Sequence, residues 1–208
     1  MRKPMRLGIM GGTFDPIHFG HLVTAEEALV QFNLDKVIFM PAGQPSHKPD
    51  VVVTRPEHRY LMSVIATSAN PDFDVSRDEI DRGGPTYTID TMLALRETYG
   101  PKAELYFITG ADAVWEIATW KDANRFEGLC TFISATRPGY DLQSALEEHG
   151  TTLSHLSIEF IEVPSLAISS TDIRKRVQQR HPIRYLTPEP VVSYIHKYNL
   201  YRGNSHGV

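Results

Sequence analysis

Short apolar runs alternate with helix-like segments along most of this 208-residue chain. The apolar runs have the length of buried strands, and the segments between them have a helical period of about 3.6 residues. We expect strands at Leu7–Met10, Val37–Pro41, Phe73–Ser76, Leu105–Thr109, Thr131–Ser134 and Ile158–Val163. This alternation predicts an α/β fold with a doubly wound, mainly parallel sheet and helices on both of its faces.

The helical segments fill the spaces between these strands and continue beyond the last one. They are predicted at Gly20–Phe32, Pro56–Ser68, Tyr87–Tyr99, Ala111–Ile117, Leu142–His149, Thr171–Gln179 and Pro190–Tyr198. We expect residues 1–208 to form a single domain, with a small C-terminal helical part at about residues 165–208. The longest stretch without a predicted element, residues 42–55, is of a kind that is often functional.

Composition excludes several kinds of partner and location. A net charge of −4 gives no global field that would attract nucleic acid or an acidic membrane. No run approaches the roughly 20 apolar residues of a membrane helix, and the N-terminal apolar stretch ends too early for a signal peptide. The single cysteine, Cys130, fits a reducing compartment. We therefore expect a cytoplasmic protein with no nucleic acid or membrane partner.

A glycine pair and two histidines follow the first predicted strand, in GGTFDPIHFGHL (Gly11–Leu22). A strand, a tight turn and a helix in this order form the unit in which α/β folds bind phosphate. We expect Gly11 and Gly12 to allow backbone angles that side chains forbid and to let the amides approach a ligand. His18 and His21 would share one side of the first helical turn, where imidazoles donate hydrogen bonds to phosphate oxygens.

Other interpretations of the histidine pair remain open at this point. The two side chains could bind a metal ion, cap the helix or lie on the surface, although no third metal ligand is obvious nearby. The glycine spacing of a dinucleotide fingerprint is absent, and so is the Gly-Lys-Ser/Thr ending of a P-loop. These absences disfavour an ordinary dehydrogenase and a P-loop kinase.

Hydroxyl side chains occupy a second predicted helix start, in ISSTDIR (Ile168–Arg174). Ser169 followed three residues later by Asp172 is also a capping-box pattern, so a purely structural role remains an alternative. The two roles are compatible, because a helix N-terminus with free amides is itself an anion site. Arg174, about one turn further, can direct its guanidinium at phosphate groups.

The two motifs resemble the signatures of the HxGH nucleotidyltransferase superfamily. Within it, the chain is similar to the bacterial nicotinate-nucleotide adenylyltransferases almost end to end, through GGPTYTIDT, TGAD, ATRPGY and PEPVVSYIHKYNLY. The resemblance implies a Rossmann-like nucleotidyltransferase fold. It also implies adenylyl transfer from ATP to nicotinate mononucleotide, giving nicotinate adenine dinucleotide and pyrophosphate in NAD biosynthesis. The alternatives are a nicotinamide mononucleotide or phosphopantetheine adenylyltransferase of the same superfamily, or a non-catalytic nucleotide-binding sensor.

The resemblance also implies roles for individual residues, with His18, His21 and Arg174 as the catalytic ones. The implied ATP-binding residues are Gly11, Gly12, Thr13, Phe14, His18, His21, Gly110, Asp112, Ser169, Ser170, Thr171 and Arg174. The implied mononucleotide-binding residues are Lys48, Tyr87, Thr88, Trp120 and Arg137. Mg²⁺ is expected to arrive with ATP and to need few dedicated protein ligands. By residue pattern alone, Asp112 could be a helix cap and Trp120 part of the core, and the oligomeric state, a homodimer included, stays open.

Overall fold

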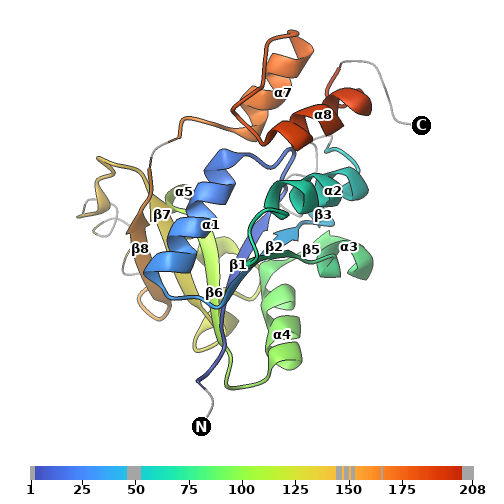
Figure 1. Ribbon diagram of the computed structural model, residues 1–208. Helices are drawn as coiled ribbons and strands as arrows, with labels where there is room; N and C mark the ends of the chain where they lie inside the picture. The colour runs from blue at the N-terminus through green and yellow to red at the C-terminus, as the bar shows by residue number, and fades with distance from the viewer. Residues whose placement is uncertain are drawn as a thin grey trace.

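The computed structural model describes residues 3–45, 53–143, 147, 150, 153–164 and 166–202 (Figure 1). The strands are β1 (Arg6–Gly12), β2 (Lys36–Pro41), β3 (Gln44–Pro45), β4 (Phe73–Val75), β5 (Pro85–Thr86), β6 (Glu104–Gly110), β7 (Thr131–Thr136) and β8 (Ser157–Glu162). The helices are α1 (Phe19–Gln31), α2 (Pro56–Thr67), α3 (Asp78–Arg82), α4 (Thr88–Tyr99), α5 (Ala111–Val114), α7 (Ser170–Gln178) and α8 (Glu189–Lys197). Two 3₁₀ turns are η1 (Ile117–Thr119) and η2 (Ala123–Phe126). Among the described helices, none is both long and apolar enough to cross a membrane.

The main sheet has the strand order β4-β2-β1-β6-β7-β8, and its neighbouring strands all pair in parallel. The chain enters at the centre of the sheet with β1, builds outward to β4, and then returns to build the other half from β6 to β8. This arrangement confirms the predicted doubly wound, Rossmann-like sheet. The direction of winding reverses between β1 and β6, and ligands bind such sheets at the carboxyl ends of the strands beside that point.

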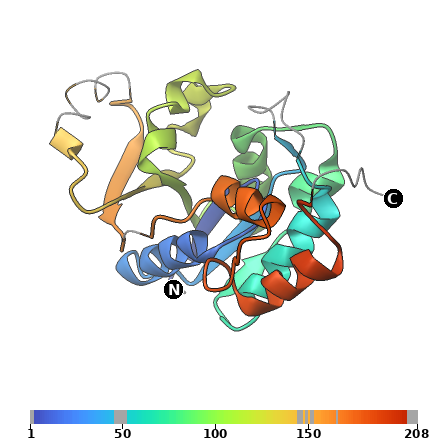
Figure 2. The same cartoon turned by 90° about the horizontal axis from the view of Figure 1, so that it is seen from above.

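Two buried apolar clusters lie on the two faces of the sheet. One combines Ala25 of α1 and Met62 of α2 with Ile173 of α7 and Ile195 of α8. The other contains Met92 of α4, together with side chains from α5 and η2. Seen from above, α8 runs beside α2, and α7 lies over the carboxyl end of the sheet near the beginning of α1 (Figure 2). The C-terminal helices thus share a core with the first glycine-histidine motif.

Several short elements differ from the sequence prediction. Residues 42–55 were expected to hold no regular structure, yet Gln44–Pro45 pairs in parallel with Pro85–Thr86 as a separate two-stranded sheet. The predicted helix Ala111–Ile117 is divided into α5 and η1. Strands of two residues have no periodicity that a sequence could reveal. Of the predicted helix Leu142–His149, residues 144–146 and 148–149 lie outside the described part of the chain.

Candidate active site

The beginnings of α1 and α7 line one cavity of about 300 Å³. Its walls are Thr13, Phe14, Asp15, His18, His21, Val53, Ile168, Ser169, Ser170, Thr171 and Arg174. The histidine motif and the serine-rich motif, which are far apart in the sequence, therefore open onto the same space. A single ATP molecule could contact both motifs only if they faced one space in this way.

A second cavity of about 340 Å³ adjoins the first at the carboxyl ends of β1 and β6. Its walls are Met10, Gly11, His18, Gly20, His21, Thr24, Ile108, Thr109, Gly110, Ala135, Arg137, Val163, Pro164, Leu166 and Ile168. His18, His21 and Ile168 line both cavities. At Gly110 a Cβ atom would meet nothing within 4 Å, so the second cavity is open at this position. Both cavities therefore meet at the two histidines.

The glycine pair acts differently from the sequence prediction. Gly11 and Gly12 belong to β1, and the positive φ of this turn, 48°, is at Phe14 instead. A Cβ on Gly12 would lie 2.8 Å from the Phe14 ring, and one on Gly11 would lie 3.0 Å from the Phe107 ring. The expectation of special backbone angles at these glycines is wrong. They are small because two aromatic rings pack directly against the strand.

His18 and His21 form a stacked pair at the start of α1. Their ring centroids are 3.7 Å apart, with an interplanar angle of 24°. The His18 backbone N–H donates to Nδ1 of His21 at 3.2 Å, so the proton of a neutral His21 ring lies on Nε2. A Cβ on Gly20 would lie 3.0 Å from Nδ1 of His18, so the glycine between the histidines makes room for the first ring.

Exclusion of water keeps both imidazoles neutral near pH 7. His18 is only 7% exposed, and burial lowers its pKa to about 4. Desolvation, followed by the nearby His18, lowers the pKa of His21 well below its ordinary value. A bound phosphate would raise both pKa values, because an anion favours the charged ring. Before any ligand binds, His21 still offers a neutral Nε2–H donor.

The start of α7 is attached to the histidine motif by hydrogen bonds. The Ser169 hydroxyl accepts from the backbone N–H of Asp172 at 3.1 Å, which confirms its capping role. Ser170 Oγ donates to the carbonyl of Pro16 at 2.8 Å, and Arg174 Nη1 donates to the carbonyl of Asp15 at 2.7 Å. A guanidinium has five N–H donors, so this contact leaves others for a phosphate.

Sequence reasoning did not anticipate the network around Asp15. This carboxylate is 4% exposed, and it accepts from the Tyr201 hydroxyl at 2.7 Å and from the Thr54 backbone N–H at 3.1 Å. Burial and the adjacent carboxylate raise the pKa of Tyr201 well above its ordinary value. Protein donors therefore occupy both oxygens of Asp15, which makes it a structural anchor of the turn. The partners come from distant segments, so no local sequence signal could have identified them.

The predicted mononucleotide residues divide into two groups. Trp120 is half-buried, edge-on to Phe107 at 5.9 Å, and the following residue, Lys121, lies 4.5 Å from the centre of the Tyr87 ring. The segment of Trp120 therefore meets the start of α4, where Tyr87 and Thr88 lie. Arg137 lines the second cavity with Gly110, whereas Tyr87, Thr88 and Trp120 are not among the residues that line it.

For two predicted site residues, Lys48 and Asp112, the structure describes no side chain. Lys48 lies outside the described residues altogether. Within the described part of the chain, no group of three histidine, cysteine, aspartate or glutamate side chains is arranged to hold a metal ion. The histidine pair thus lacks a third metal ligand among these residues.

Fold and site together define a nucleotidyltransferase, and a cytidylyltransferase-like family profile matches residues 9–176. A relative from Moorella thermoacetica is 56% identical over 209 residues, covering 99% of this chain and 96% of the relative. One from Thermoanaerobacter sp. is 56% identical over 205 residues, covering 97% of each. Both carry the name "probable nicotinate-nucleotide adenylyltransferase". This chain belongs to the nicotinate-nucleotide adenylyltransferase family.

Solved structures confirm the fold. The structure titled "Plasmodium falciparum nicotinic acid mononucleotide adenylyltransferase complexed with NaAD" matches with a TM-score of 0.74 and 22% sequence identity. The match covers 95% of this chain and 97% of that chain. A second structure of the same protein, complexed with APC, matches with a TM-score of 0.73 and 21% identity, with the same coverage.

Proposed function

We propose that this chain transfers the adenylyl group of ATP to nicotinate mononucleotide at the paired cavities, giving nicotinate adenine dinucleotide and pyrophosphate. The observation that carries this proposal is the single cavity shared by His18, His21 and the Ser169–Arg174 helix start. The family membership supports this reaction, and the two cavities suggest where the parts of ATP bind. The shared cavity and the family membership together favour an enzyme over a sensor that only binds nucleotide.

The shared walls of the two cavities suggest how ATP would lie. The adenosine would occupy the second cavity, beside Gly110, and the β- and γ-phosphates would occupy the first, beside Arg174. The α-phosphate would then lie where the cavities meet, at His18 and His21. Aligned amides at the N-termini of α1 and α7 would favour the negative charge from both sides.

The reaction needs positioning and charge stabilisation more than proton transfer. The 5′-phosphate of the mononucleotide is already anionic near neutral pH, because its second pKa is about 6. One of its oxygens forms a bond to the α-phosphorus, while the bond from the α-phosphorus to the bridging oxygen breaks and its electron pair leaves with pyrophosphate. His21 would donate its Nε2–H to an α-phosphate oxygen as negative charge develops.

The departing pyrophosphate would be held at the start of α7. Arg174, Ser170 and Thr171 line the first cavity there. Mg²⁺ would enter with ATP, coordinated chiefly by phosphate oxygens and water, since this ion usually retains several waters. Its charge would offset the repulsion between the two anionic substrates.

The acceptor would bind near the junction of Trp120 with the start of α4. We propose that the pyridine ring stacks on Trp120 and that Thr88 and the neighbouring amides donate to the nicotinate carboxylate. Tyr87 would border this ring site. Lys48 and Arg137 remain proposed phosphate partners.

The test is to incubate the chain with ATP, Mg²⁺ and each candidate acceptor, and to resolve the products by chromatography. Nicotinate mononucleotide should give the dinucleotide and pyrophosphate with the highest kcat/KM. Preference for nicotinamide mononucleotide or phosphopantetheine would assign the chain to a sister activity. ATP binding without product from any acceptor would identify a sensor.

A further inference from the structure

Arg59, near the start of α2, is a fully buried cation that lies outside both cavities. It is 1% exposed and has the largest volume among the completely buried side chains of the described residues. Its Nε donates to the Thr54 carbonyl at 2.8 Å, Nη1 to the Thr13 carbonyl at 2.8 Å and Nη2 to the Gly43 carbonyl at 3.0 Å. Burying a guanidinium is costly unless its donors are satisfied, and here three backbone carbonyls satisfy it.

The three carbonyls belong to three segments that meet behind the first cavity. Thr13 lines that cavity directly, and Val53, which precedes Thr54, lines it too. Gly43 leads into β3, and β3 pairs with β5, which ends one residue before Tyr87. Arg59 therefore connects the phosphate side of the site with the start of α4, where the acceptor is proposed to bind.

Close packing at Gly43 makes this connection stiff. A Cβ atom on Gly43 would lie 2.4 Å from the backbone oxygen of Glu79 in α3. Real contacts do not come this close, so a larger residue would force β3 and α3 apart. A shift at Gly43 would therefore be transmitted to the small β3–β5 sheet, with few voids to absorb it.

The surroundings of Arg59 leave its charge in place. Burial lowers the pKa of Arg59, while Asp15, Tyr201, Glu57 and Glu79 act in the opposite direction. Because a guanidinium stays protonated in proteins, a positive charge persists behind the loop that faces the phosphates. Geometry and charge can be separated, since lysine would retain the charge while losing the three-way fork.

We propose that Arg59 is a positioning residue for adenylyl transfer. It holds the Thr13 loop at a fixed distance from the β3–β5 sheet, so that the acceptor phosphate meets the α-phosphorus in line. This inference rests on the proposed function, and it assigns Arg59 no contact with either substrate.

The test compares Arg59→Lys with Arg96→Lys. Arg96 of α4 also donates to backbone carbonyls, those of Gly100, Pro101, Ala103 and Leu129, but near the amino ends of the strands. Arg59→Lys should lower kcat by ~10²-fold, the effect that a displacement of about 1 Å can have, and should raise KM for the mononucleotide. Binding of a non-hydrolysable ATP analogue should change much less. Arg96→Lys should lower the thermal midpoint and leave kcat and both KM values unchanged.

Two results would overturn the inference. One is wild-type kcat and mononucleotide KM in Arg59→Lys, and the other is an equal kinetic loss in Arg96→Lys. If Arg59→Lys does not fold, Gly43→Ala decides, because it keeps the Arg59 side chain but displaces the Gly43 carbonyl to which Arg59 donates. This variant should show the same selective rise in mononucleotide KM, and an unchanged KM would contradict the inference. Lack of dinucleotide synthesis by the wild-type chain would instead refute the proposed function.

Discussion

The starts of α1 and α7 face the same cavity, but they present different kinds of side chain to it. The start of α1 holds two stacked imidazoles that are kept neutral by desolvation, with Nδ1 of His18 buried and without a hydrogen-bond partner within the described residues. The start of α7 holds hydroxyls and a guanidinium that are already bonded to the loop below, through the carbonyls of Pro16 and Asp15. The start of α1 therefore has a ring nitrogen without a partner among the described residues, whereas the side chains at the start of α7 are already hydrogen-bonded within the protein.

The two helix starts are therefore suited to different tasks. A buried nitrogen without a partner costs about 1–3 kcal/mol, a cost that persists in active sites because ligands can relieve it. Ser169, by contrast, has the ordinary partner of a helix cap. We therefore expect substitution of the α1 histidines to lower turnover, and substitution of the Ser169 cap to affect stability and nucleotide affinity.

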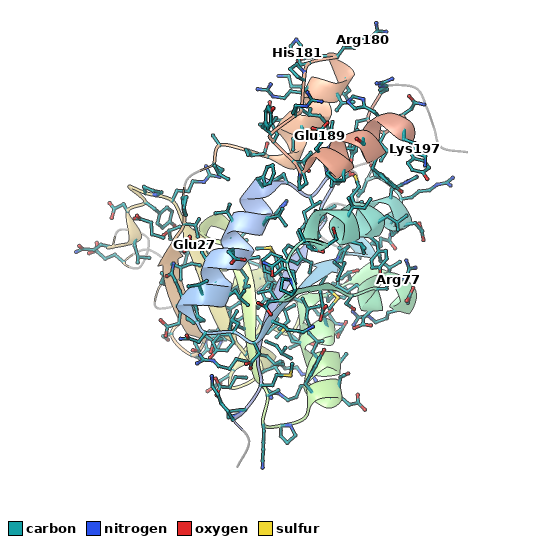
Figure 3. The ribbon with its side chains drawn as sticks, in the orientation of Figure 1. Glu27, Arg77, Arg180, His181, Glu189 and Lys197 are labelled. Carbon is teal, nitrogen blue, oxygen red and sulfur yellow. The ribbon has the colours of Figure 1, made fainter. Side chains whose placement is uncertain are left out.

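The largest expected effect is that of His21→Ala. Removal of a donor to the developing charge should lower kcat by ~10²–10³, while ATP binding weakens much less. Steady-state kinetics and calorimetric titration would measure the two quantities. His181→Ala is the matched control, because this exposed histidine lies just beyond the C-terminal end of α7, on the side away from the sheet (Figure 3). Near-normal turnover in His21→Ala would contradict the claim that the start of α1 acts in catalysis.

The second prediction concerns the pH dependence of stability. The pKa of His18 is about 4 in the folded protein and 6.5 in the unfolded chain, so the unfolded state binds the proton first as pH falls. His18 should therefore lower the free energy of unfolding by roughly 3 kcal/mol as pH falls from 6.5 to 4. Urea unfolding of His18→Asn should show a smaller loss of stability than wild type over this range.

Glu79 acts in the opposite direction and serves as the internal check. Burial raises its pKa to about 7, so its carboxylate destabilises the fold as pH rises from 4.5 through 7. Glu79→Gln should therefore gain stability relative to wild type at pH 8 but not at pH 4. An identical pH slope for His18→Asn and wild type would show that the α1 histidines are not held neutral.

Trp120 tests whether the acceptor site is separate from both helix starts. Trp120→Ala should raise KM for the mononucleotide more than KM for ATP, since a stacking contact contributes ~1–3 kcal/mol. Steady-state kinetics with each substrate varied in turn would measure this. Equal increases in both KM values would return Trp120 to a purely structural role in the core.

The smallest effect is expected at α7. Ser169→Ala removes the cap and should lower the free energy of unfolding by about 1 kcal/mol, as measured by urea denaturation. Turnover should stay close to that of the wild type. A loss of kcat as large as that of His21→Ala would mean that the two helix starts share one task.

Local signals explain what the sequence could predict. Periodicity predicted the six strands of the main sheet, and the cap pattern at Ser169 predicted the start of α7. The short β3 and β5 strands offered no such pattern. Arg59 stands among polar neighbours in PEHRYLM, where a charge is typical of an exposed helical face, and its three carbonyl partners come from distant segments. Likewise, the tight space at Gly11 depends on Phe107, a contact that only the folded sheet creates.

The most direct measurement is a crystal structure with a non-hydrolysable ATP analogue and Mg²⁺. One analogue molecule should span both cavities, with its base beside Gly110 and its terminal phosphates beside Arg174. An α-phosphate oxygen should lie within hydrogen-bond distance of Nε2 of His21. An analogue confined to one cavity, with neither histidine in contact with a phosphate, would contradict the account.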